Sequence, residues 1–209
     1  MKKKVLSLLV GIAAVPGVLA LPTVVINNTP ADPGLMLTAV TSANGTFQTF
    51  CLETSEYVSI GTRYWYDVGT AAKFNNISGN SDPICLATAW LYTSYNTVSG
   101  YSPDATHHNA IQNAIWALED ESSTASALRD AYISAAQTGA GLGWASDAGG
   151  AYGVYVMNVF TADAPNNDFA HRAQDFLLRV PGVPDGGLTV MLLGLGLGSL
   201  AFVSRKIRK

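Results

Sequence analysis

Two cysteines are the residues whose chemistry most constrains the function of this sequence. Cys51 and Cys85 are the only cysteines in the chain. In an exported protein such a pair is typical of a disulfide bond. A buried free cysteine instead behaves as a small hydrophobic residue, and a deprotonated thiol is a nucleophile. The residue types alone leave all three possibilities open.

Other reactive side chains give weaker signals. His107 and His108 are adjacent near the start of a predicted helix, where they are candidates for proton transfer but are more typical of solvated positions, and His171 stands alone. A cysteine–histidine protease dyad has no support beyond the residue types. No cluster has metal-ligand spacing, and no glycine-rich loop has the phosphate-binding arrangement. The sequence therefore predicts no cofactor and no metal site.

The elements that must position these side chains follow the order β, α, β. β-Branched runs, alternation and an Asn-Gly hairpin turn at 42–45 predict early strands at 23–26, 35–41, 46–53 and 62–68. Turns are expected at 27–28 and 30–34. Helical spacing of apolar residues predicts helices over 84–95, from 103 or 104 to 119, and over 125–137. A closing strand is expected at 174–180, while 152–159 is ambiguous between strand and helix.

Two helix starts are predicted from local signals. The first helix is expected to begin at Ser81 or Asp82 with Pro83 in its first turn. The third is expected to be capped within the run 122–124, where two serines precede a threonine. The whole pattern predicts an α+β domain, a β-rich sandwich or barrel-like structure with an inserted helical segment, spanning 21–182.

The charge of this predicted domain differs from that of the whole chain. The net charge of the chain is -3, but seven of its twelve basic residues lie in the terminal segments 1–20 and 183–209. Between 21 and 182 there are fourteen acidic and five basic side chains, which gives a net charge of -9. An acidic, lysine-poor surface argues against nucleic-acid binding, which needs basic groups to displace counterions from phosphates.

The first twenty residues have the pattern of a signal peptide. Three lysines at 2–4 precede an apolar run over 5–15, and Val18-Leu19-Ala20 offers small side chains for cleavage after Ala20. The sequence therefore predicts export through signal peptidase. The mature domain would then begin at residue 21.

The C-terminal end has three parts in order. Val183-Pro184-Asp185-Gly186-Gly187 precedes a sixteen-residue uncharged segment, 188–203, and a basic tail follows. A helix of that length spans roughly 24 Å, short of the ~30 Å hydrocarbon layer, and the tail would stay cytoplasmic. This arrangement resembles the sorting signal of PEP-CTERM-type proteins in its VPDGG variant. The resemblance implies an exosortase-type membrane protease as a partner, a membrane-anchored precursor, and a mature form at the cell surface or in the extracellular matrix.

The body resembles the thioester domains of bacterial surface proteins. The matching segments are Phe50-Cys51-Leu52-Glu53, 89–93 with Tyr95, Ile111-Gln112-Asn113-Ala114-Ile115-Trp116, 150–154 and 173–177. The resemblance implies a bond between the Cys51 sulfur and the Gln112 side-chain carbonyl, formed with loss of ammonia. A nucleophile on a surface protein or polysaccharide, typically a lysine amine, would then become joined to Gln112. Such a protein acts once and is not an enzyme.

The main alternative to this reading is a non-reactive structural or matrix protein that has a Cys51–Cys85 disulfide or two free thiols. Gln112 would then be a polar residue on an amphipathic helix. Five aromatic residues are either walls that exclude water from a thioester or ordinary core: Tyr64, Trp65, Tyr66, Trp90 and Trp116.

Overall fold

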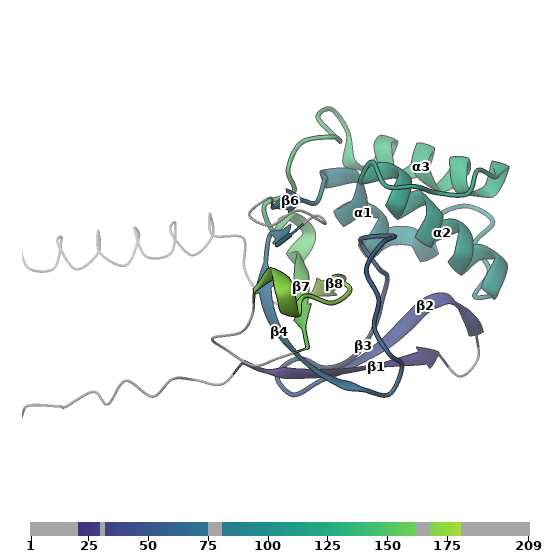
Figure 1. Ribbon diagram of the computed structural model, residues 1–209. Coiled ribbons are helices and arrows are strands. Elements are labelled where there is room, and N and C mark those ends of the chain that lie inside the picture. Colours follow the sequence, from purple (N-terminus) through teal and green to yellow (C-terminus); the bar gives the residue numbers. More distant parts are fainter. Residues whose placement is uncertain (1–20, 30–31, 75–80, 162–167, 181–209) are drawn as a thin grey trace, which may run out of the picture.

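The computed structural model describes residues 21–29, 32–74, 81–161 and 168–180, with only the backbone described for 32–35 (Figure 1). The predicted signal peptide, the VPDGG motif at 183–187 and the apolar segment 188–203 lie outside these residues. Within the described ranges, no helix has both the length and the apolar character needed to cross a membrane.

The described residues form a mixed α and β structure, which confirms the predicted α+β class. Six strands make one antiparallel sheet in the order β3-β2-β1-β4-β7-β8, and β5 and β6 form a separate pair. Three α-helices are inserted between β6 and β7 and lie together on one side of the sheet (Figure 1). The strands are β1 (Thr23–Thr29), β2 (Asp32–Thr41), β3 (Gly45–Thr49), β4 (Arg63–Gly69), β5 (Ala71–Ala72), β6 (Asp82–Pro83), β7 (Val154–Phe160) and β8 (Phe176–Arg179). The helices are α1 (Leu86–Ser94), α2 (Ala105–Leu118) and α3 (Ala127–Ala140).

The sheet nearly closes on itself at the residues that follow β3. Cys51 forms an isolated antiparallel bridge with Phe176, the first residue of β8. On either side of this bridge, Leu177 donates its N–H to Phe50 (3.1 Å) and Leu52 donates to Asp175 (3.0 Å). The first and last strands of the sheet therefore meet, which gives the barrel-like form of the predicted fold.

Alternation along the strands sorts side chains between two hydrophobic clusters. On β1 and β4, Val24, Ile26, Tyr64 and Tyr66 are buried in one cluster. The helices pack on the other face of the sheet with Phe50, Val156 and Leu177. β7 is buried along almost its whole length. Its sequence is ambiguous for this reason, since a strand covered on both faces shows no alternation.

The first hairpin region corrects two predictions and confirms a third. The turn expected over 30–34 is wrong from Asp32 onward, where β2 begins and pairs with Thr29 of β1. Asn27 and Asn28 were expected in a turn but continue β1, paired with Thr38 and Leu37. Pairing along β2 supplies partners for their backbone groups. The register of this strand pairing shifts only after them, between Asn28 and Thr29. The predicted turn around the Asn-Gly signal is confirmed, since Gly45 begins β3 with a φ of 73°.

The start of the first helix was predicted too early. Asp82 and Pro83 are paired with β5 in an extended conformation, and the N-cap of α1 is Cys85, whose sulfur accepts the Thr88 N–H at 3.5 Å. Pairing with β5 therefore overrides the local signal of an acidic residue before proline. The start of α2 agrees with prediction, because the Asp104 side chain accepts the N–H of His107 at 2.9 Å.

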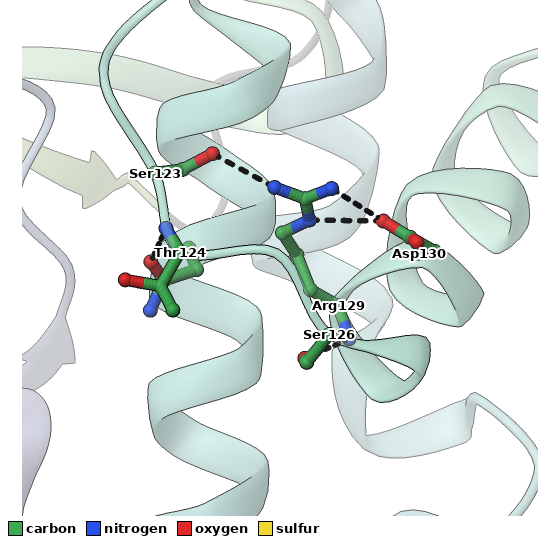
Figure 2. A network of polar contacts seen from close by, with 6 residues as sticks. Ser123, Thr124, Ser126, Arg129 and Asp130 are labelled. Carbon is green, nitrogen blue, oxygen red and sulfur yellow. Dashed lines mark hydrogen bonds and ion pairs between the residues drawn. The ribbon is translucent and has the colours of Figure 1, made fainter.

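The third helix also begins later than predicted. Its N-cap is Ser126, which accepts the Arg129 N–H at 3.1 Å. Figure 2 shows how the guanidinium of Arg129 donates to Asp130 in the first turn and to Ser123 in the preceding segment. Ser123 thus holds the entry to the helix through a side chain and does not cap it.

Candidate functional site

Cys51 lies where the nearly closed sheet meets itself. It follows β3 and is partly exposed, while Phe50 and Leu52 on either side are buried. Because the backbone groups of Phe50 and Leu52 bond to the β8 segment, the N–H and C=O of Cys51 point to the opposite edge. That edge is the one that faces Gln112.

Gln112 supplies both partners for this edge. Its Nε2 donates to the C=O of Cys51 at 2.7 Å, and its Oε1 accepts the N–H of Cys51 at 2.8 Å. One donor and one acceptor fix the orientation of an amide. The amide carbon is therefore held beside the residue that bears the thiol. The structure thus brings the two predicted site residues together across 61 positions of sequence.

The helix α2 presents Gln112 because the residue lies on its apolar face. Ile111 and Ile115 are fully buried in the cluster under the helices, and Gln112 is also fully buried. A buried amide costs free energy unless its polar atoms are hydrogen-bonded. The backbone of Cys51 meets this requirement, so the amide side chain completes an edge that none of the described strands covers.

The thiol of Cys51 is protonated at neutral pH. Burial raises its pKa to about 12, and only a backbone hydrogen bond opposes this shift. A thiolate is the nucleophilic form of cysteine. The site therefore holds Cys51 beside an amide, but only a small fraction of Cys51 is in the reactive thiolate form at neutral pH.

The two cysteines are both free thiols with separate surroundings. Cys85 is buried at the start of α1, where its sulfur lies 3.7 Å from the Leu118 carbonyl oxygen. Burial, followed by the nearby Glu119, raises its pKa to about 11. The disulfide considered from the sequence is therefore not formed, and Cys85 has the role of a small capping and core residue.

The other predicted candidates have contacts of their own. His107 Nδ1 lies 2.7 Å from the Tyr132 hydroxyl, and His108 Nε2 lies 3.1 Å from the Tyr101 hydroxyl. Tyr64 and Tyr66 belong to the hydrophobic cluster that Cys51 packs against. Of the other aromatic residues considered as walls or core, Trp90 packs against the helix-side cluster, as a core residue would.

Sequence reasoning missed a group of buried acidic residues beside this site. Glu53, Glu56 and Asp175 are all buried, and each offers a carboxylate oxygen within 4.8 Å of the others. Burial, followed by the neighbouring Glu56, raises the pKa of Glu53 to about 9. Burial also raises the pKa of Asp175. The sequence does place acids next to apolar residues, at Leu52-Glu53 and Asp175-Phe176. That these acids lie close together depends on the tertiary structure and could not be predicted from this pattern.

Comparison of the chain with protein families, curated proteins and solved structures finds no match.

Proposed function

We propose that this chain is an exported adhesion module with a thioester-domain-like fold, in which Cys51 and Gln112 form an internal thioester that couples to target nucleophiles. The observation that carries the proposal is the pair of hydrogen bonds between the Gln112 amide and the backbone of Cys51. These bonds orient the amide of one residue against the residue that bears the thiol. Such positioning is the main requirement for an intramolecular acyl transfer.

Bond formation would proceed through attack of the Cys51 sulfur on the Gln112 side-chain carbonyl carbon. The negative charge then develops on Oε1, which already accepts the Cys51 N–H at 2.8 Å. A donor placed at the developing charge stabilises the tetrahedral intermediate. The thiol gives up its proton before the attack, Nε2 takes up a proton as the C–N bond breaks, and ammonia leaves. The products are one thioester and one ammonia.

Capture of a target would consume this stored bond. A lysine amine of a surface protein, or another nucleophile such as one on a polysaccharide, attacks the thioester carbonyl. The carbon–sulfur bond breaks, Gln112 becomes joined to the target through an amide, and the Cys51 thiol is regenerated. Because the Gln112 side chain stays attached to the target, the protein reacts once and does not turn over.

The terminal segments support a place of action outside the cytoplasm. The signal-peptide pattern at 1–20 and the VPDGG arrangement at 183–209 are consistent with export, a membrane-anchored precursor and release to the cell surface or matrix by an exosortase-type protease. The acidic composition of the intervening domain is consistent with a protein or polysaccharide target, and not with nucleic acid.

Intact-mass measurement of freshly isolated, non-denatured protein tests the proposal. The wild-type chain should be lighter than its sequence mass by one ammonia, while Cys51→Ala and Gln112→Ala should have their full sequence masses. Methylamine should add to the wild type at Gln112 and to neither variant. Cys85→Ala is the matched control and should retain the deficit. A wild type with its full sequence mass would overturn the thioester.

The second candidate is a non-reactive matrix or structural protein with the same fold. The raised pKa of the Cys51 thiol favours it, and so does the complete hydrogen bonding of the Gln112 amide, which already closes the strand edge without any covalent bond. This candidate predicts the full sequence mass and no methylamine adduct. A deficit of two hydrogens that a reductant removes would contradict the thioester and establish the Cys51–Cys85 disulfide form of the non-reactive protein.

A further inference from the structure

Three acidic side chains from separate parts of the chain meet in the interior beside the Cys51 segment. Glu53 and Glu56 lie in the segment that follows Cys51, and Asp175 directly precedes β8. Their exposed fractions are 3%, 7% and 4%. Each contributes a carboxylate oxygen to a group whose members lie within 4.8 Å of one another. We call these three residues the acidic cluster.

The polar contacts of the acidic cluster leave one carboxylate without an N–H donor among the described residues. Asp175 Oδ1 accepts the N–H of Val159 at 3.1 Å. Glu56 Oε1 lies 2.8 Å from Nε of Arg172. Both oxygens of Glu53 are buried and accept no hydrogen bond from an N–H donor of the described residues. Their polar neighbours are the carboxyl groups of Glu56 and Asp175. A buried carboxylate with unused oxygens is unusual and indicates a missing ligand or a bound proton.

The ion pair that the structure shows for the acidic cluster does not balance its charge. Arg172 pairs with Glu56, so the three acids and this cation together have a net charge of -2 when fully ionised. Burying uncompensated charge is strongly unfavourable. Protons can neutralise the cluster when no other cation is bound. A dication would neutralise the same charge with all three carboxylates ionised.

We propose that Glu53, Glu56 and Asp175 bind one hard divalent cation, with Ca²⁺ as the best fit. All the donors are carboxylate oxygens, which Ca²⁺ and Mg²⁺ prefer and which offer Zn²⁺ none of its usual nitrogen or sulfur ligands. Ca²⁺ binds oxygens at about 2.3–2.6 Å, so ligands on opposite sides of the ion lie about 5 Å apart. Oxygens that gather within 4.8 Å match this spread. The smaller Mg²⁺ would require a tighter octahedral set.

The site would tie the Cys51 segment to the strand that it meets. Glu53 is two residues beyond Cys51, and its C=O accepts Nε2 of Gln174 at 2.9 Å, next to Asp175. A cation shared by Glu53, Glu56 and Asp175 would therefore fasten residues 51–56 to the start of β8, where the sheet closes. The proposal uses none of the atoms of the thioester and holds whether or not that bond forms.

Calorimetric titration of the chelator-treated full-length chain with CaCl₂ tests this proposal. We expect one Ca²⁺ per chain with a dissociation constant of roughly 10⁻⁴ to 10⁻³ M, the range of extracellular calcium modules. The melting temperature should rise by several degrees in ~10 mM CaCl₂ relative to EDTA. MgCl₂ should give a smaller shift at the same concentration.

Matched variants distinguish the acidic cluster from other acidic surfaces. Glu53→Gln keeps the shape of the side chain but removes its charge, and should abolish both the binding heat and the calcium-dependent shift in melting temperature. Asp175→Asn should do the same, as a second test that does not depend on the folding of one variant. Asp130→Asn, an exposed position paired with Arg129, should leave both signals unchanged.

Two results would overturn the proposal. One is the absence of binding heat and of any shift in the wild type up to ~10 mM CaCl₂, which would assign the acidic cluster to protons alone. The other is calcium binding that is equal in wild type and Glu53→Gln, which would place the ion elsewhere. The Cys51→Ala variant should bind Ca²⁺ like the wild type, so failure of the thioester and failure of this site are separate outcomes.

Discussion

The amide of Gln112 pairs with the backbone of Cys51 in the way that a neighbouring strand would. Its Nε2 donates to the Cys51 C=O and its Oε1 accepts the Cys51 N–H. The other edge of the same backbone is bridged to Phe176 in β8. A single helix side chain therefore completes the sheet at its point of closure, and the cysteine at that point is the more exposed of the two cysteine residues.

The pairing predicts that Gln112 is essential to stability even if no thioester forms. In Cys51→Ala, where no covalent bond is possible, adding Gln112→Ala should lower the free energy of unfolding by about 2–4 kcal/mol, because it leaves a buried N–H and C=O without partners. Adding Asn113→Ala should cost less than about 1 kcal/mol, since the contacts of Asn113 are exposed. Urea denaturation measures both. Equal costs at the two positions would contradict this interpretation.

The pKa of Cys51 predicts how thioester formation depends on pH. With a pKa of about 12, the thiolate fraction rises about tenfold for each pH unit through the neutral and mildly alkaline range. After refolding, the rate at which one ammonia is lost should therefore rise about tenfold between pH 7 and 8, followed by mass spectrometry. A rate that does not change with pH would show that deprotonation of the thiol does not limit the reaction. Cys85→Ala should follow the same profile.

The acidic cluster predicts a loss of stability as the pH rises in the absence of metal. The pKa of Glu53 is raised in the folded state, from an ordinary value of 4.5 to about 9, so the folded protein binds more protons than the unfolded chain between these values. The free energy of unfolding should then fall as the pH increases from about 5 to 9, because ionisation favours the unfolded chain. Thermal denaturation in EDTA measures this dependence.

The isosteric variant is the control for this pH dependence. Glu53→Gln has no proton to lose and should have a flatter stability profile over the same range, with a melting temperature at pH 8 equal to or above that of the wild type. An identical slope in wild type and Glu53→Gln would show that other groups cause the dependence. Added Ca²⁺ should flatten the wild-type profile if the cation replaces the protons.

The start of α3 predicts a difference between two nearby serines. Ser126→Ala removes the acceptor for the Arg129 N–H and should destabilise the protein by about 1 kcal/mol, as measured for other N-caps. Ser122→Ala, in the run where the cap was expected from the sequence, should stay within about 0.5 kcal/mol of the wild type, since this position is exposed. Chemical denaturation measures both changes. A larger loss of stability for Ser122→Ala than for Ser126→Ala would support the helix start expected from the sequence.

Much of the element order could be predicted from the sequence because it depends on local patterns. Alternation and β-branched residues predicted β1 and β4, the Asn-Gly turn predicted the hairpin before β3, and Asp104 with a helical apolar pattern predicted α2. The errors lie where long-range pairing overrides a local signal. Asp82 and Pro83 have a helix-start pattern, but they pair with Ala71–Ala72 and leave Cys85 as the cap.

The sequence by itself determined which residues are available for chemistry: two cysteines, one glutamine on a predicted amphipathic helix, and acids beside apolar residues. Only the tertiary structure decided which of them meet. Closure of the sheet turns one edge of the Cys51 backbone toward α2, and the fully buried Gln112 satisfies that edge because a buried amide must be hydrogen-bonded. The same closure brings Asp175 to Glu53 and Glu56. The physical reason is that contacts between residues far apart in the chain depend on strand register and sheet closure, which no local pattern encodes.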